Sequence, residues 1–78
     1  MADFLILTKS GCAHCERAKT MLRVKGLEFD VSHYETQEQF DEFISRGFRT
    51  YPQVFYRGEH IGGADDLANW LDGASDNF

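Results

Sequence analysis

The 78-residue sequence has little cysteine and proline, no excess of positive charge and no long apolar run. Eight Lys and Arg against 13 Asp and Glu give a net charge of −5. That balance argues against nucleic acid or an anionic membrane as a partner, because both reward basic patches. No stretch is long enough to span a bilayer, and the first residues lack the basic segment of a secretory signal. We therefore expect a cytoplasmic protein that binds neither nucleic acid nor membrane.

The two cysteines, Cys12 and Cys15, are too few for the disulfide framework of a small secreted domain. In a reducing compartment, such a C-x-x-C pair is more often catalytic or metal-binding. A structural zinc site usually needs four ligands, and the chain has neither a second cysteine pair nor a His-x₃₋₅-His motif. We therefore expect no metal site, and redox chemistry becomes the leading interpretation.

Apolar periodicity and turn residues predict seven elements in the order β-α-β-α-β-β-α. The predicted strands are residues 3–8, 27–33, 53–56 and 59–61, and the predicted helices are residues 12–25, 36–46 and 64–71. Strands joined through a helix should be parallel, whereas the last two strands, joined around Arg57-Gly58, should form an antiparallel hairpin. We expect one α/β domain over residues 1–78, with its core at about 3–72. Its mixed four-stranded sheet should be flanked by three helices.

The same patterns predict which side chains are buried. The apolar run of the first strand, residues 4–7, is typical of a central strand that is covered on both faces. The other predicted inward positions are Cys15, Ala18, Met21 or Leu22, Val24, Leu27, Phe29, Val31, His33, Phe40, Phe43, Ile44, Leu67, Trp70 and Leu71. A capping box at Thr36 and Gln39 marks the start of the second helix.

Cys12 is expected at the N-terminus of the first helix, where unpaired N–H groups and the helix dipole favour a thiolate. Cys15 lies one turn later on the same face, close enough for a disulfide. Lys9 is either a solvated loop residue or a cation that favours the thiolate and attracts an anionic substrate. His14 is either an exposed helical residue or a contact to the substrate or the thiolate.

Two further segments can reach the same end of the sheet, residues 50–52 and residues 62–66. By itself, Pro52 predicts a trans proline that starts a strand. Two glycines followed by two aspartates predict a turn and a helix start. The alternative for this segment is that its open N–H groups bind a substrate carboxylate. His33 and His60 are interpreted as structural.

Three motifs together, Lys-Ser-Gly-Cys-x-x-Cys, Thr-x-Pro-Gln-Val-Phe and Ile-Gly-Gly-x-Asp-Asp-Leu, resemble those of glutaredoxins in order and spacing. Glutaredoxins are small members of the thioredoxin superfamily, and the resemblance covers about residues 4–71. It implies a thioredoxin-like fold and a glutathione-dependent thiol–disulfide oxidoreductase with no bound cofactor. The expected enzyme is a monomer that reduces protein disulfides and glutathione mixed disulfides, with Cys12 as the nucleophile and Cys15 as the resolving thiol.

The resemblance also implies that Pro52 is cis and that the Tyr51 backbone faces the cysteines. Asp65 and its helix N-terminus would hold the γ-glutamyl end of glutathione. Lys9 would hold the glycyl carboxylate, with Arg46 or Arg49 added from their position in the sequence. The full set expected to contact glutathione is Lys9, His14, Thr50, Tyr51, Pro52, Gly63, Asp65 and Asp66.

Two departures from the family pattern bear on function. Ala13-His14 replaces the frequent Pro-Tyr between the cysteines, which should alter a redox potential for which about 30 mV is a tenfold change in equilibrium. Tyr51 replaces a common valine and changes the substrate groove. Some members without that proline hold an iron–sulfur cluster between two subunits with glutathione as ligand, so cluster binding is one alternative. The other is a thioredoxin-like donor, for example to ribonucleotide reductase, that is recycled by a flavoprotein reductase.

Overall fold

The computed structural model describes residues 2–74 and has the predicted order of elements. The elements are β1 (Phe4–Thr8), α1 (Ala13–Val24), β2 (Phe29–His33), α2 (Gln37–Ser45), β3 (Gln53–Tyr56), β4 (Glu59–Gly62) and α3 (Ala64–Ala74). Relative to the sequence prediction, β2 begins two residues later and α3 continues three residues further. The expected polar tail lies largely outside the described residues.

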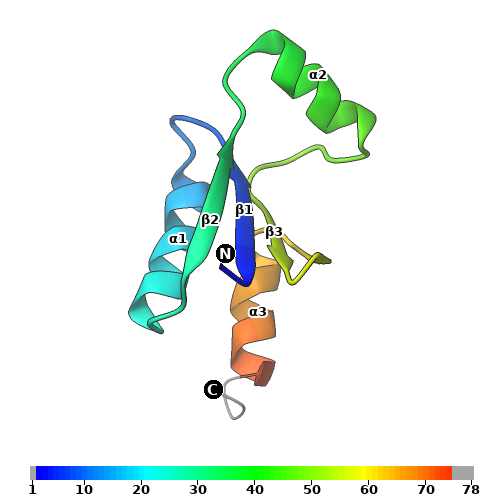
Figure 1. Cartoon of the computed structure of the whole chain (residues 1–78). Coiled ribbons are helices and arrows are strands. Elements are labelled where there is room, and N and C mark those ends of the chain that lie inside the picture. The colour runs from blue at the N-terminus through cyan, green and yellow to red at the C-terminus, as the bar shows by residue number, and fades with distance from the viewer. Residues whose placement is uncertain (1, 75–78) are drawn as a thin grey trace.

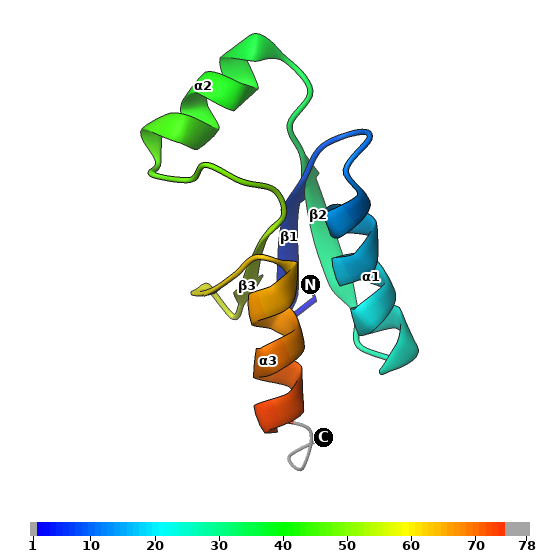
Figure 2. The same ribbon diagram turned by 180° about the vertical axis from the view of Figure 1, so that it is seen from behind.

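The four strands form one mixed sheet in the order β2-β1-β3-β4. As predicted, β1 pairs in parallel with β2, and β3 and β4 form an antiparallel hairpin. β1 also pairs antiparallel with β3, which places it in the interior of the sheet. Helices α1 and α3 lie side by side on one face, whereas α2 lies past the ends of the strands (Figures 1 and 2).

The main core fills the space between the sheet and the pair α1 and α3. Its buried side chains are Phe4, Ile6, Ala18, Leu22, Val54, Ala64, Leu67 and Leu71. Trp70 packs against this cluster, with its ring 5.7 Å from that of Phe4 and 4.9 Å from that of Tyr56. Because each fully buried Leu, Ile or Phe contributes about 1.5–3 kcal/mol, this cluster is the principal source of stability.

A second cluster holds α2 to the rest of the molecule. It consists of the buried Leu7, Tyr34 and Phe43, with Phe40, Phe48, Tyr51 and Phe55 packed against them. The ring of Phe43 stacks on that of Tyr51 at a centroid distance of 4.0 Å and an interplanar angle of 9°. The predicted capping box is present: Gln39 N donates to Thr36 Oγ1, and Thr36 N donates to Gln39 Oε1.

Two predicted core positions on helices are wrong. Val24 is 80% exposed, because it lies nine residues after Cys15, which at 100° per residue is the opposite face of α1. Ile44 is 62% exposed, because α2 contacts the second cluster through the face that carries Phe43. Trp70, by contrast, packs against the main core as predicted.

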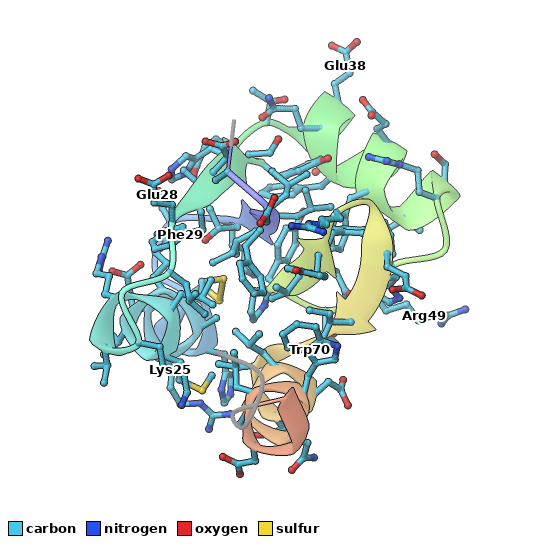
Figure 3. The ribbon with its side chains drawn as sticks, turned by 60° about the horizontal axis from the view of Figure 1, so that its bottom comes forward. Lys25, Glu28, Phe29, Glu38, Arg49 and Trp70 are labelled. Atoms are coloured by element: carbon cyan, nitrogen blue, oxygen red, sulfur yellow. A yellow bond between two sulfur atoms is a disulfide. The ribbon has the colours of Figure 1, made fainter. Side chains whose placement is uncertain are left out.

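The predicted coverage of both sheet faces is also wrong. Leu5 is 37% exposed and Val31 41% exposed, and His33 is exposed as well. Leu5 is left open to solvent because α2 lies past the strand ends rather than over the centre of the sheet (Figures 1 and 2). Val31 and His33 pair with Ile6 and Thr8 and so share their face, but they lie on the edge strand β2. The face of β1 that carries Phe4 and Ile6 is fully covered, and Trp70 of α3 packs against it (Figure 3).

Candidate active site

The two cysteines lie at the start of α1 and form a disulfide, with their Cα atoms 5.2 Å apart. Cys12 is the N-cap residue, and its Sγ accepts a hydrogen bond from Cys15 N at 3.2 Å. Cys12 is partly exposed, whereas Cys15 is completely buried. An attacking thiol can therefore reach the sulfur of Cys12 from solvent but not that of Cys15.

The loop before β3 passes directly beside Cys12. The Tyr51 carbonyl oxygen lies 3.8 Å from Cys12 Sγ, so the Tyr51 backbone faces the cysteines. The Tyr51–Pro52 peptide bond is cis, as the family resemblance implies, and not trans as the residue alone suggests. Gln53 Nε2 braces the loop by donating to Thr50 O at 2.9 Å and to Thr50 Oγ1 at 3.3 Å.

The third segment, at the start of α3, lies against the cis-proline loop. A Cβ placed on Gly63 would lie 3.7 Å from Pro52 O. The Asp66 carboxylate accepts a hydrogen bond from Gly63 N at 3.0 Å and so caps the helix. The segments at Cys12, Pro52 and Gly63, far apart in sequence, are thus adjacent in space. The first-turn N–H groups of α3 point toward this junction, as at any helix start.

Asp65 is exposed and forms an ion pair with Arg17 from the second turn of α1. The hydrogen bond from Arg17 is the main reason that the pKa of Asp65 lies below its usual range, and the charge of His14 acts in the same direction. His14 itself is exposed. This edge of the site therefore presents a carboxylate that stays ionised, with the Arg17 guanidinium beside it.

On the α2 side of the site, Lys9 Nζ lies 5.3 Å from the centre of the Tyr51 ring. Lys9 and Tyr51 line a hollow of about 190 Å³ together with Arg49, Phe40, Phe43 and Ile44. Arg46 instead donates to Tyr34 Oη at 3.3 Å. Of the two arginines considered from the sequence, Arg49 is thus the one that shares a hollow with Lys9.

The side chain of Tyr51 reaches from the active-site loop into the second hydrophobic cluster. Burial raises the pKa of its hydroxyl, with Tyr34 and Glu35 adding to the effect. Its hydroxyl oxygen is buried and has no hydrogen-bond partner within residues 2–74. The aromatic ring stacked on Phe43 thus connects the loop that faces Cys12 to helix α2.

A larger hollow, of about 520 Å³, lies on the other side of Cys12. Its lining residues are Lys9, Ser10, Gly11, Cys12, Ala13, Glu16, Lys19 and His33. The loop between β1 and α1, which lines this hollow, is held by Glu35, which accepts hydrogen bonds from Ser10 N at 3.0 Å and Ser10 Oγ at 2.9 Å. The loop that carries Cys12 is thereby tied to the residues that follow β2.

Two of these contacts were missed from the sequence. Ser10–Glu35 joins residues 25 apart, and Arg17–Asp65 joins residues 48 apart. Neither Arg17 nor Asp65 carries a signal of this pairing, because each alone is an ordinary exposed charge on its own helix. His33 Nδ1 lies 3.5 Å from Glu35 Oε1, and His60 Nε2 lies 2.6 Å from Gln53 Oε1.

Within residues 2–74, no group of three or more His, Cys, Asp or Glu side chains is arranged to hold a metal ion. In the same range, none of the helices combines the length and the apolar character needed to cross a bilayer. The site carries one accessible sulfur at a helix N-terminus, that of Cys12, and a buried second sulfur, that of Cys15.

Comparison with known proteins agrees with this geometry. The glutaredoxin family model matches residues 4–61. Glutaredoxin 3 of Escherichia coli strain K12 is 42% identical over 69 residues, which cover 86% of this chain and 83% of the relative. The solution structure of glutaredoxin from Brucella melitensis superposes with a TM-score of 0.74 at 40% identity, covering 99% of this chain and 87% of the other.

A buckwheat glutaredoxin–glutathione complex superposes with a TM-score of 0.75 at 27% identity, covering 92% of this chain and 71% of the other. These likenesses establish the α/β thioredoxin-like fold with its mixed four-stranded sheet and three helices. The C-x-x-C pair occupies the start of the first helix in this fold. The chain therefore belongs to the glutaredoxin family and is a thiol–disulfide oxidoreductase whose active site is the dithiol pair Cys12 and Cys15.

Proposed function

We propose that this glutaredoxin uses glutathione to reduce protein disulfides and glutathione mixed disulfides, as a single-domain monomer in the cytoplasm. The observation that carries the proposal is the meeting of three segments at Cys12. The Tyr51 carbonyl lies 3.8 Å from its sulfur, and the start of α3 lies against the same loop. A peptide disulfide placed over Cys12 would therefore contact main-chain groups on one side and a helix N-terminus on the other.

The charges around Cys12 fit a zwitterionic tripeptide such as glutathione. Lys9 and Arg49 share a hollow that would receive the glycyl carboxylate. The ionised Asp65 and the N-terminus of α3 would hold the ammonium and carboxylate of the γ-glutamyl end. The other residues of the proposed contact set are Thr50, Pro52, Gly63, Asp66 and His14, and Gly63 lies against Pro52.

The proposed reaction begins with the Cys12 thiolate, which the helix N-terminus and Cys15 N favour as an anion. Cys12 attacks one sulfur of the substrate disulfide, that S–S bond breaks, and the first thiol leaves with a proton. Cys15 then loses its proton and attacks Cys12 Sγ, which forms the Cys12–Cys15 disulfide and releases the second thiol. Two glutathione molecules restore the dithiol and become glutathione disulfide.

The test is glutathione-dependent reduction of a peptide–glutathione mixed disulfide by the wild type, Cys12→Ser and Cys15→Ser. We expect Cys12→Ser to lose essentially all activity, because it removes the accessible nucleophile. Cys15→Ser should retain deglutathionylation but lose the reduction of protein disulfides, which needs the resolving thiol. Full activity of Cys12→Ser would refute the assignment of the nucleophile.

The same preparations separate the two rival functions. Turnover with a flavoprotein thioredoxin reductase, and none with glutathione, would identify a thioredoxin-like donor, for example to ribonucleotide reductase. A brown dimer after anaerobic purification, whose visible absorbance disappears on oxidation, would identify an iron–sulfur protein. A colourless monomer that turns over with glutathione supports the proposed function.

A further inference from the structure

Thr8, the last residue of β1, is completely buried, and its hydroxyl oxygen has no hydrogen-bond partner among residues 2–74. Buried hydroxyls without a partner are rare in folded proteins because their desolvation is not compensated. The reaction proposed above does not use Thr8. An unpaired hydroxyl at the end of the strand that leads to Cys12 therefore calls for a physical explanation.

The topology places Thr8 beside Cys15. Along β1, Thr8 continues the row of Phe4 and Ile6, because side chains alternate between the faces of a strand. Along α1, Cys15 continues the row of Ala18 and Leu22. Both rows belong to the main core between the sheet and α1, and α1 begins where β1 ends (Figure 1).

The two residues therefore occupy the same end of one buried layer, and neither has any exposed surface. Thr8 ends its row at the last position of β1, and Cys15 begins its row in the first turn of α1. The hydroxyl of Thr8 is consequently the polar side-chain group of β1 that is placed to meet the sulfur of Cys15.

We propose that Thr8 is a positioning residue for Cys15, and that its hydroxyl pairs with the Cys15 sulfur only when the disulfide is open. The proposal rests on the Cys12–Cys15 dithiol, not on the glutathione site. In the disulfide, Cys15 Sγ is bonded to Cys12 Sγ and has no proton to donate, and it accepts no hydrogen bond from the Thr8 hydroxyl. Two electrons and two protons from an external dithiol open the bond. Each cysteine sulfur then takes up one proton, or Cys12 remains a thiolate and its proton passes to solvent.

The freed Cys15 thiol has both a weak donor and an acceptor, so it can pair with the Thr8 hydroxyl in either direction. Reduction thereby satisfies a buried group that oxidation leaves unpaired, which favours the dithiol and makes the pair more oxidising. In the resolving step, the Thr8 O–H would also donate to the Cys15 sulfur as that sulfur loses its proton.

The test is the equilibrium constant of the Cys12–Cys15 pair against dithiothreitol, a reductant that needs no glutathione-binding surface. Thr8→Val keeps the size and branching of the side chain but removes the hydroxyl. We expect this variant to shift the equilibrium about tenfold toward the disulfide, equivalent to a potential about 30 mV more negative. Thr8→Ser, which keeps the hydroxyl, should remain close to the wild type.

Ile6→Val is the matched control, because it trims the neighbouring side chain in the same buried row without changing a polar group. A wild-type equilibrium constant for Thr8→Val would overturn the proposal. An equally large shift for Thr8→Ser or Ile6→Val would overturn it too, because packing would then be the cause. Loss of glutathione turnover by the wild type would contradict the proposed function alone, since the dithiothreitol equilibrium would be unaffected.

Discussion

Gly62, at the end of β4, is a position near the active site where adding a single methyl group should strongly destabilise the fold. Its φ of +126° lies in a region that residues with a side chain rarely adopt. A Cβ at Gly62 would also lie 2.7 Å from Asp66 Cγ and 2.8 Å from Asp66 Cβ, which is too close for any real contact. Gly62→Ala must therefore strain the backbone and displace the Asp66 carboxylate that caps α3.

The two effects can be added. Backbone strain of this kind costs about 1–3 kcal/mol, and loss of a helix cap costs about 1 kcal/mol. We expect Gly62→Ala to lower the free energy of unfolding by about 3 kcal/mol. That is a large part of the roughly 4–12 kcal/mol that a domain of this size possesses. For a domain of under 100 residues, this loss lowers the melting temperature by about 15 °C.

Urea unfolding followed by the fluorescence of Trp70 measures this loss, because Trp70 lies on α3 itself. Gly63→Ala is the matched control. Its new methyl group would lie 3.7 Å from Pro52 O, an ordinary contact, and Gly63 does not have a positive φ. The control should change stability by no more than about 1 kcal/mol. Equal losses for the two variants would refute the reasoning about Asp66 and the backbone.

Three further outcomes follow from the contacts of α2 and of the loop before α1. Phe43→Ala should lose about 3–5 kcal/mol of unfolding free energy, whereas Ile44→Ala, at an exposed position, should change it by under about 0.5 kcal/mol; similar losses would contradict the described packing of α2. Thr36→Ala should lose about 1 kcal/mol by removing the capping box, measured by urea unfolding, and Thr36→Ser should restore most of it. The hydrogen bond from the Ser10 hydroxyl is the main reason that the pKa of Glu35 is lowered. The ionised Glu35 therefore contributes its full stabilisation of the folded state at pH values above its unfolded-state pKa. That contribution disappears as the pH falls through the folded-state pKa of Glu35. In Ser10→Ala, an NMR titration should find the pKa of Glu35 raised, and an unchanged value would assign the shift to another contact.

The parts of the fold that the sequence predicts well depend on local chemistry. The capping-box residues Thr36 and Gln39 predict the start of α2, and Arg57-Gly58 predicts the turn between β3 and β4. The errors concern which faces are covered. Val24 lies on the opposite side of α1 from the predicted one. The exposure of Leu5 depends on where α2 lies, and that of Val31 on the position of β2 at the sheet edge; periodicity within one element encodes neither.

The candidate site divides in the same way. The position of Cys12 at a helix N-terminus follows from an apolar strand, a short loop and a helical pattern in succession. The Arg17–Asp65 pair does not follow, because each residue alone is an ordinary exposed charge on its own helix. Only the packing of α1 beside α3 brings the two together.

The separation of the hydrophobic residues into two clusters has a consequence for how the molecule unfolds. Trp70, the single tryptophan, belongs to the cluster beneath α1 and α3, whereas Tyr34 and Tyr51 belong to the cluster beneath α2. Tryptophan emission therefore reports on the first cluster, whereas tyrosine near-ultraviolet dichroism reports mainly on the second, because only Tyr56 of the three tyrosines packs beside Trp70. Coincident transitions would show that the two clusters melt as one cooperative unit, and an earlier tyrosine transition would show that the α2 layer separates first.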